Sequence, residues 1–244
     1  MTIANKVVVL TGAGRGIGRA TALHLAAHGA HLVLGARSEA EIAAVTQEIE
    51  RAGGKAVYRA TDVTRRADLD ALVELACERF GRLDVIVNNA GIGPISRFAS
   101  LYVDDWDAMI DVNLRGALYG IAAALPVFGR QGSGHIINVV STAGLKIVPT
   151  MGVYAATKNA LRTATEALRQ ESPNLRTTEV SPGFIDTSFA ERAISDPDIK
   201  AAIQKRKDEL AISPDAIARA IAFTIDQPED VEIGSIVVRP TAQD

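Results

Sequence analysis

The run Val7-Val8-Val9-Leu10 leads directly into Thr11-Gly12-Ala13-Gly14-Arg15-Gly16-Ile17-Gly18, and together these residues carry the strongest pattern in the chain. Four consecutive apolar residues, three of them β-branched, predict a strand that is buried on both faces. The glycines after it predict a tight turn into a helix, where the backbone can approach a phosphate group at the helix N-terminus. The spacing Gly12-x-x-x-Gly16-x-Gly18 differs from the G-x-G-x-x-G dinucleotide fingerprint, so a tight connection without a ligand is the alternative.

The alternation of strand and helix continues through the chain, because short β-branched runs are separated by longer stretches of helical period. This pattern predicts an α/β fold with a doubly wound, seven-stranded parallel sheet and helices on both faces. The length of the chain, without a linker rich in Pro, Gly or Ser, favours a single domain over residues 1–244. The expected strands are 6–10, 31–36, 56–60, 84–88, 135–140, 176–181 and 233–238, and the expected helices are 16–28, 39–52, 66–80, 104–128, 153–171 and 214–226.

One segment breaks this alternation. Residues 183–212 form a long, strongly charged stretch between the sixth expected strand and the last expected helix. A segment of this length inside a compact domain usually has a function. We expect a partly helical substrate lid there.

The composition narrows the class of protein. Hydrophobic residues make up 48% of the 244 residues and charged residues 23%, and the formal net charge is −3 with the basic residues dispersed. This balance gives no electrostatic footprint for nucleic acid or an anionic membrane, and no run approaches 18 uncharged apolar residues. The first residues lack a signal-peptide pattern, and the single cysteine, Cys77, fits a reducing compartment. We therefore expect a cytoplasmic protein without nucleic-acid or membrane partners.

The end of the second expected strand indicates which dinucleotide the glycine turn would bind. NAD-binding folds of this type place an acidic residue there to hold the ribose hydroxyls. This chain has Ala36 followed by Arg37, and a guanidinium can bind a 2′-phosphate through two parallel hydrogen bonds. Arg15, inside the glycine turn, could approach the same phosphate from the other side. Either arginine alone is more often a solvated surface residue, but the pair predicts NADP(H) rather than NAD(H).

Candidate catalytic groups follow the fourth and fifth expected strands, at the edge where open α/β sheets bind ligands. Asn88-Asn89-Ala90-Gly91 closes the fourth strand, and Ser141 closes the fifth. Tyr154 and Lys158 lie four residues apart on an expected helix and therefore share one face. A lysine ammonium near a tyrosine hydroxyl favours the phenolate, so we expect a lowered Tyr154 pKa and a general acid/base role. Ser141 could hydrogen-bond the substrate oxygen beside it.

Each of these motifs is weak alone, since a tyrosine four residues before a lysine often marks an ordinary surface helix. Their order along one α/β chain, however, resembles that of the short-chain dehydrogenase/reductase family in its compact branch, over residues 5–240. The resemblance implies a Rossmann-type fold and hydride transfer at a carbon that bears oxygen. It implies Asn113, Ser141, Tyr154 and Lys158 as catalytic residues. With the residues discussed above, the expected cofactor-binding set is Gly12, Gly14, Arg15, Gly16, Ile17, Gly18, Arg37, Asp62, Val63, Asn89, Ala90, Gly91, Tyr154, Lys158, Pro182, Gly183, Ile185 and Thr187.

The same resemblance implies individual roles. Asp62 would hydrogen-bond the adenine amino group with Val63 beside it, and Lys158 would hold the nicotinamide ribose. Asn113 would hold a bent helix and a water that relays protons to Lys158. Ile185 and Thr187 would bind the carboxamide.

Two other functions use the same fold. A protein that senses NADP(H) without turnover would typically lack the tyrosine or the lysine, and both are present here. Epimerisation or dehydration usually needs a longer C-terminal substrate domain than this chain has after Pro182-Gly183. We therefore expect an enzyme that interconverts a carbonyl and a secondary or primary alcohol.

The assembly and the substrate are less constrained. The resemblance implies a homotetramer, less often a dimer, and helices 104–128 and 153–171 are rich enough in apolar residues to meet another subunit.

The ending Val238–Gln243 resembles a subgroup that includes 3-hydroxy acid (serine-type) dehydrogenases and clavulanate dehydrogenase. We expect the pocket walls to come from 93–97, 143–151 and 184–212. An apolar cavity is suggested by Ala143, Leu145, Ile147, Val148 and Phe184, and Lys146 or Arg192 could hold a carboxylate. His24 and His28 lie four apart without a third ligand nearby, so we expect no metal.

Overall fold

Strand β1 (Val7–Thr11) shows why the first apolar run is unbroken. Val8 and Leu10 pack into the hydrophobic core on one side of the sheet, and Val7 and Val9 pack into the core on the other side. All four side chains are at most 1% exposed. The strand is therefore covered on both faces, as the sequence predicts for a parallel sheet between helices.

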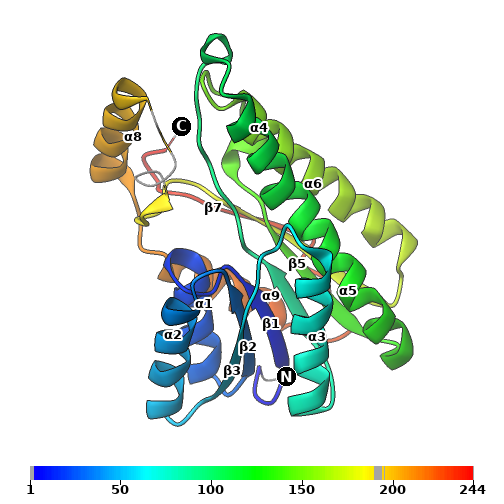
Figure 1. The fold of residues 1–244 in the computed structure, drawn as a ribbon. Coiled ribbons are helices and arrows are strands. Elements are labelled where there is room, and N and C mark those ends of the chain that lie inside the picture. The colour runs from blue at the N-terminus through cyan, green and yellow to red at the C-terminus, as the bar shows by residue number, and fades with distance from the viewer. Residues whose placement is uncertain (1–2, 190–193, 195, 244) are drawn as a thin grey trace.

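The computed structural model, which describes residues 3–189, 194 and 196–243, contains a seven-stranded parallel sheet (Figure 1). The strand order is β3-β2-β1-β4-β5-β6-β7, so the chain winds outward from β1 to β3 and then returns to β4 on the other side of β1. This reversal creates a crevice at the carboxyl ends of β1 and β4, where open α/β sheets bind ligands. The remaining strands are β2 (His31–Ala36), β3 (Lys55–Ala60), β4 (Val85–Asn88), β5 (Gly134–Val139), β6 (Leu175–Pro182) and β7 (Ser235–Val238).

Helices cover both faces of the sheet (Figure 1). On one face, α1 packs against α2 and α9 over the core that contains Val8 and Leu10. On the other face, α3 packs against α5 over the core that contains Val7 and Val9, and α6 lies beside them. The helices are α1 (Gly16–Ala27), α2 (Glu39–Arg51), α3 (Arg66–Phe80), α4 (Val103–Met109), α5 (Gly116–Gln131), α6 (Gly152–Glu171), α8 (Pro197–Leu210) and α9 (Asp215–Ile225), with short helical turns η1 (Phe98–Ser100), η2 (Ile110–Arg115) and η3 (Thr142–Gly144).

The expected fold class is confirmed, and most expected boundaries lie within two residues of the structure. The largest difference concerns the helix expected at 104–128. It continues to Gln131, and its middle section, η2, is a π-helical turn rather than an α-helix. Period alone cannot show this widening, because it depends on a contact that Asn113 makes with a distant loop, as described below.

The helical run Val103–Gln131 is also the one stretch of the described chain that is long and apolar enough to cross a membrane. Half of its most apolar window is buried inside the fold, where α5 packs against α3 and β4. Burial in the core explains the apolar composition, so this run is a core helix.

The described part of the expected lid, 183–189, 194 and 196–212, contains the helix α8. Asp196 caps it by accepting hydrogen bonds from the backbone N–H groups of Asp198 and Ile199, at 3.0 and 3.1 Å. The two ends of the segment are tied together, because Ile185 and Ile212 form a parallel bridge. The segment is thus partly helical, as expected; its role as a lid stays a prediction.

Candidate active site

The predicted site residues come from six different strands but lie along one edge of the sheet. In a parallel sheet all carboxyl ends point the same way, so the residues that follow β1 to β6 are brought together. These are the glycine turn after β1, Arg37 after β2, Asp62 after β3, Asn89 after β4, Ser141 after β5 and Gly183 after β6. Tyr154 and Lys158 reach this edge from the first turns of α6.

The glycine turn has the backbone shape that its composition predicts. Gly12 and Gly16 have φ angles of +66° and +52°, a region that other residues rarely adopt. A Cβ on Gly18 would overlap the Gly12 carbonyl oxygen, and a Cβ on Gly12 would lie 2.9 Å from the Cα of Ala90. The turn is therefore packed so closely that three of its positions require glycine.

The Asn-Asn-Ala-Gly motif supports this turn. The side chain of Asn89 donates to the carbonyl oxygens of Thr11 and Gly12, at 2.9 and 3.3 Å. The Thr11 hydroxyl accepts hydrogen bonds from the backbone N–H groups of Asn89 and Ala90, both at 3.1 Å. The amide of Asn89 is thus engaged in holding the first strand's turn, a role that its place after β4 does not reveal.

The backbone at this turn fits a pyrophosphate. Helix α1 has no side-chain cap on its N-cap residue Arg15 and no acidic residue in its first turn. Its first backbone N–H groups therefore keep the partial positive charge of a helix N-terminus. The glycines leave the backbone open at the same place, so the chain presents a cradle for a phosphate-containing cofactor.

Next to the cradle, Arg15 has a partner that sequence reasoning missed. Its guanidinium Nη1 lies 3.8 Å from Oε1 of Glu41, in the first turn of α2. The Glu41 carboxylate also lies against the turn, since a Cβ on Gly14 would be 3.0 Å from Oε2. The backbone N–H of Glu41 donates to the hydroxyl of Ser38, the N-cap residue of α2, at 3.4 Å. Arg37 is exposed directly after β2.

Asp62 and Val63 lie after β3, where the adenine is expected. One carboxylate oxygen of Asp62 accepts hydrogen bonds from the backbone N–H and the hydroxyl of Thr64, at 3.0 and 2.8 Å. Val63 is buried against α5, where a Cβ on Gly116 would lie 2.8 Å from its Cγ2. The small residue in α5 lets Val63 pack tightly, which fixes the position of Asp62 beside it.

Asn113 lies inside the π-helical turn η2 and is only 1% exposed. Its side chain makes a reciprocal pair with Ile92, accepting from the Ile92 N–H and donating to the Ile92 carbonyl, both at 2.8 Å. It also donates to the Thr157 hydroxyl at 3.3 Å. The π turn accommodates this bridge between the loop after β4 and α6, in line with the tendency of such turns to occur at functional sites.

Lys158 is 4% exposed, and its ammonium donates to the carbonyl oxygen of Val139 at 2.9 Å. Burial lowers the pKa of Lys158 to about 8. The ammonium faces Gly91, because a Cβ there would lie 3.5 Å from Nζ and 3.3 Å from Oδ1 of Asn113. Asn113 and Lys158 are therefore neighbours around one glycine.

Tyr154 and Ser141 also meet, since the Ser141 hydroxyl donates a hydrogen bond to the Tyr154 oxygen. Burial raises the pKa of Tyr154, and this hydrogen bond lowers it by a smaller amount. The expected lowering by Lys158 is wrong for the protein chain alone. The Lys158 ammonium lies 5.9 Å from the centre of the Tyr154 ring, and desolvation of the phenolate outweighs the stabilising contacts.

The last group of predicted residues follows β6. Thr187 lies across the glycine turn, with its Cγ2 3.1 Å from a Cβ on Gly16, and Pro182 ends the strand itself. Gly183 is packed against Arg239 and Gln243 of the C-terminal segment. Gln243 accepts from the backbone N–H of Phe184 at 2.9 Å and donates to the Thr142 hydroxyl at 3.2 Å. The C-terminal segment therefore links the start of the expected lid to the turn that carries Ser141.

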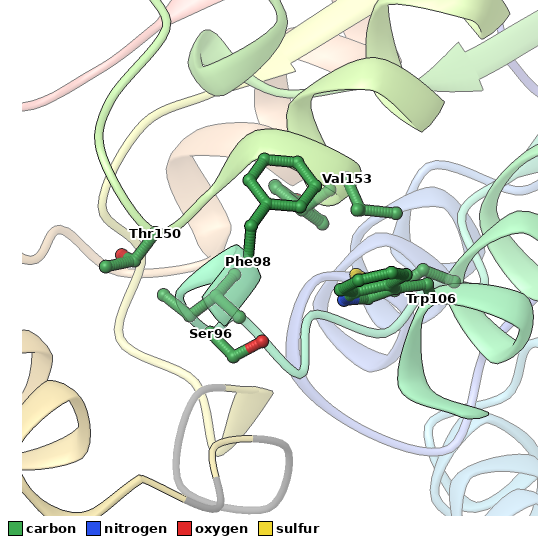
Figure 2. Close-up of a pocket in the computed structure, with 8 residues that line it drawn as sticks. Ser96, Phe98, Trp106, Thr150 and Val153 are labelled. Atoms are coloured by element: carbon green, nitrogen blue, oxygen red, sulfur yellow. The ribbon is translucent and has the colours of Figure 1, made fainter. Parts of the chain in front are cut away.

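A small cavity lies beside Tyr154 (Figure 2). Its volume is about 10 Å³, room for about one water molecule. The rings of Phe98 and Trp106 meet there edge to face with centroids 5.6 Å apart. The Ser96 hydroxyl, which is buried without a hydrogen-bond partner, is the one orphaned polar side-chain atom among the described residues that line it. The lining residues are Ile95, Ser96, Phe98, Trp106, Met109, Thr150, Val153 and Tyr154.

Two residues that the sequence suggested for binding a carboxylate are not placed in the site by the structure. Lys146 is exposed in the loop after β5, and Arg192 lies outside the described residues. Glu41 and Gln243 touch the site through contacts between distant parts of the chain, so no local pattern could have revealed them. Phe189, which packs against Tyr154, was likewise visible only as one residue of the expected lid.

Comparison with known proteins gives consistent results. A family model described as short chain dehydrogenase matches residues 6–198. An uncharacterized oxidoreductase of Listeria monocytogenes is 47% identical to this chain over 247 residues, which cover 100% of this chain and 99% of the relative. An alcohol dehydrogenase from the archaeon Thermococcus sibiricus, complexed with 5-hydroxy-NADP, superposes with a TM-score of 0.88 and 33% identity over 98% of each chain.

Two further solved structures bind different cofactors. The closed form of serine dehydrogenase, complexed with NADP+, has a TM-score of 0.89 and 27% identity, and covers 98% of this chain and 96% of its own. A short-chain dehydrogenase/reductase from Burkholderia phymatum in complex with NAD has a TM-score of 0.89 and 28% identity, over 97% and 90% of the two chains. The match of most of this chain to the family model, together with the relative of 47% identity, shows that the chain is an oxidoreductase and belongs to the short-chain dehydrogenase/reductase family.

Proposed function

We propose that the protein is an NADP(H)-dependent oxidoreductase that interconverts a carbonyl and a secondary or primary alcohol, with Tyr154 as the general acid/base. The observation that carries this proposal is the hydrogen bond between Ser141 and Tyr154, one helical turn from the buried ammonium of Lys158. Two hydroxyls held together at a ligand crevice form a site for one substrate oxygen. The bound cofactor supplies the hydride to the carbonyl carbon, or accepts it from the alcohol carbon.

The raised pKa of Tyr154 suits the reduction step. A tyrosine that keeps its proton at neutral pH can donate that proton to the substrate oxygen as negative charge develops there. The Ser141 hydroxyl holds the same oxygen in place. In the oxidation direction Tyr154 must first lose its proton, and burial opposes that loss.

Lys158 and Asn113 support this proton transfer. The pKa of about 8 lets Lys158 exchange a proton near neutral pH, and Asn113 lies next to it around Gly91. We propose that Lys158 also holds the nicotinamide ribose, and that a water bound at Asn113 returns protons towards Tyr154. The engaged side chain of Asn113 fixes the geometry of this path.

The cofactor would be held by the backbone cradle at Gly12, Gly14, Gly16, Ile17 and Gly18 and by the groups after the other strands. The adenine would be held by Asp62 and Val63. The nucleoside linked to the nicotinamide would be held by Asn89, Ala90, Gly91, Tyr154 and Lys158. The carboxamide would be held by Pro182, Gly183, Ile185 and Thr187. We propose NADP(H) rather than NAD(H), because Ala36 leaves no carboxylate at the end of β2 and Arg37 follows it. Solved relatives bind NADP or NAD, so membership of the family leaves the cofactor open, and our proposal rests on the residues at this position.

Replacing Tyr154 with Phe tests the reaction. The variant keeps the ring and its packing but loses the hydroxyl, so we expect kcat for carbonyl reduction to fall by about 10²–10⁴-fold. NADPH binding, measured by its fluorescence, should be nearly unchanged, because the backbone cradle and the other cofactor-binding groups proposed above remain. Turnover that survives in this variant would contradict the acid/base role.

Replacing Arg37 with Asp tests the cofactor. We expect the NADPH/NADH ratio of kcat/KM to fall by about 10- to 100-fold, because a hydrogen bond to a charged group contributes about 1.5–3 kcal/mol. Arg51→Asp, at the exposed C-terminal end of α2, makes the same charge change away from the site and serves as the control. Equal ratios in the two variants would mean that Arg37 is an ordinary surface residue.

We further propose that 183–212 acts as the substrate lid and that the enzyme works in the cytoplasm as a homotetramer on a small-molecule substrate. Ile199 and Ile203 of α8 pack towards Tyr154, and most of the charged residues of α8 are exposed. Lys207 is largely covered and pairs with Asp186 at 3.2 Å. A helix with one apolar face over the site explains why a segment of such high charge lies beside an apolar pocket.

A further inference from the structure

Phe189 lies against the side chain on which the chemistry depends. Its ring meets the Tyr154 ring edge to face, with centroids 6.0 Å apart and an angle of 60° between the planes. Phe189 is 40% exposed, so one side of the ring faces outward while the other lies over the tyrosine. It comes from the described start of the segment 183–212, between the carboxamide-binding residues proposed above and α8.

Gly93 provides the space that Phe189 occupies. A Cβ on Gly93 would lie 2.5 Å from Cε1 and 2.8 Å from Cζ of Phe189, closer than real side chains approach. The same Cβ would lie 3.6 Å from Cδ2 of Tyr154. The loop after β4, the catalytic helix and the lid segment therefore meet at one point, where the Phe189 ring fills the gap over the backbone of Gly93.

The surroundings of this contact are apolar and nearly full. Tyr154 packs against a cluster formed by Ile95, Ile194 and Ile199, with Met151 and Ile203 at its border. The cavity on the other side of Tyr154 holds about one water molecule. None of the described residues that line this cavity is charged. On the side of Tyr154 that faces Gly93, the Phe189 ring therefore occupies space that a substrate group next to Tyr154 would need.

We propose that Phe189, seated over Gly93, is a specificity-determining residue that restricts the enzyme to carbonyl compounds with a small, uncharged substituent beside Tyr154. This inference rests on the proposed function, because it concerns the same site. A bulky substituent at this position would need the volume that the ring occupies. Truncation of the ring should therefore admit larger substrates without changing the groups that carry the proton.

The test compares Phe189→Ala with the unchanged enzyme on a graded series of ketones and aldehydes, from 2-butanone and isobutyraldehyde to acetophenone and cyclohexyl phenyl ketone. We expect the ratio of kcat/KM for large over small substrates to rise by at least about tenfold, since a pocket separates substrates by roughly this factor for each small group. Binding without turnover can be followed by the fluorescence of Trp106, the single tryptophan of the sequence, which lines the cavity beside Tyr154. Acetophenone should quench this fluorescence at lower concentration in Phe189→Ala than in the unchanged enzyme.

A second substitution examines the pairing with Gly93. Gly93→Ala should lower kcat/KM for small ketones, because the added methyl displaces the Phe189 ring towards the substrate. In the Phe189→Ala background the same Gly93→Ala change should have little effect. Phe223→Ala, which truncates an exposed phenylalanine on α9, is the control for loss of an exposed ring and should leave the large-to-small ratio unchanged.

The outcomes separate this inference from the proposed function. If the unchanged enzyme reduces carbonyls and Phe189→Ala leaves the ratio as it was, the assignment of Phe189 is wrong while the reaction stands. The same holds if larger substrates become worse in Phe189→Ala, because the ring would then be a binding surface. If the unchanged enzyme oxidises NADPH and NADH with none of the carbonyls, the proposed function fails, and the inference fails with it.

Discussion

Lys158 keeps a charged group where water scarcely reaches, and this explains its unusual acidity. Its hydrogen bond to the Val139 carbonyl does not offset the lost hydration, so the pKa of Lys158 falls to about 8. Tyr154 responds to the same burial in the opposite direction, because its charged form is the deprotonated one. Burial therefore reverses the usual order of the two pKa values, and that of Lys158 lies below that of Tyr154.

The lowered pKa of Lys158 predicts how catalytic efficiency depends on pH. Below pH 8 Lys158 is protonated and can hold the ribose hydroxyls and return protons; above pH 8 it becomes neutral. We expect kcat/KM for NADPH, which reports ionisations of the free enzyme, to fall on the alkaline side with an apparent pKa near 8. In Lys158→Arg the charge persists, so the alkaline fall should move to higher pH. An alkaline limb at the same pH in both proteins would assign it to another group.

At the level of secondary structure, strands β5 and β6 enclose a buried histidine far from the candidate site. His135, the second residue of β5, is 2% exposed, and its Nε2 lies 2.8 Å from the Thr178 hydroxyl on β6. Its Nδ1 is buried without a partner among the described residues. Burial lowers the pKa of His135 well below its usual value of 6.5, with smaller contributions from Arg176 and Lys6. The neutral imidazole is therefore a condition for this strand pairing.

The sign of the stability effect follows from that shift. Above pH 6.5 the histidine is neutral in the folded and unfolded chain, whereas below pH 6.5 only the unfolded chain takes up the proton. The free energy of unfolding should then fall by up to about 1.4 kcal/mol per pH unit through this residue. Urea titrations of His135→Gln from pH 8 to 5 should show a shallower loss than the unchanged protein, with parallel behaviour above pH 7. Equal slopes below pH 6.5 would show that His135 is protonated in the folded chain.

For the whole molecule, the α4–α5 region is where the proposed assembly would form its contact. Large apolar side chains are exposed along it at Leu101, Tyr102, Val103, Ile110 and Leu118. Exposed apolar side chains can take part in a contact with another chain, and most homo-oligomers are closed and symmetric.

Sedimentation measures the mass of the assembly directly. At micromolar concentration we expect a species with the mass of four 25.8 kDa chains. Leu118→Lys, which places a charge on the exposed face of α5, should shift the distribution to smaller species while the far-UV circular dichroism stays the same. A monomer in the unchanged protein would exclude the tetramer and the dimer alike.

Much of this description could be predicted from local patterns in the sequence. The apolar run before Gly12 predicts a strand covered on both sides, and the glycines predict its turn, because both depend on neighbouring residues only. Tyr154 and Lys158 share a helix face through their spacing of four. Parallel strands bring their carboxyl ends to one edge, so the fold class alone predicts that Ser141 joins them.

Other features depend on the assembled fold. The direction of the Tyr154 pKa depends on desolvation, which sums the atoms of every element around the ring, and no spacing in the sequence records that sum. The contacts of Arg15 with Glu41, of Gly93 with Phe189 and of Gln243 with Thr142 join residues far apart along the chain. The sequence therefore determines which candidate catalytic side chains are present. The pKa values of these side chains, and the space around them, depend on how the whole chain packs.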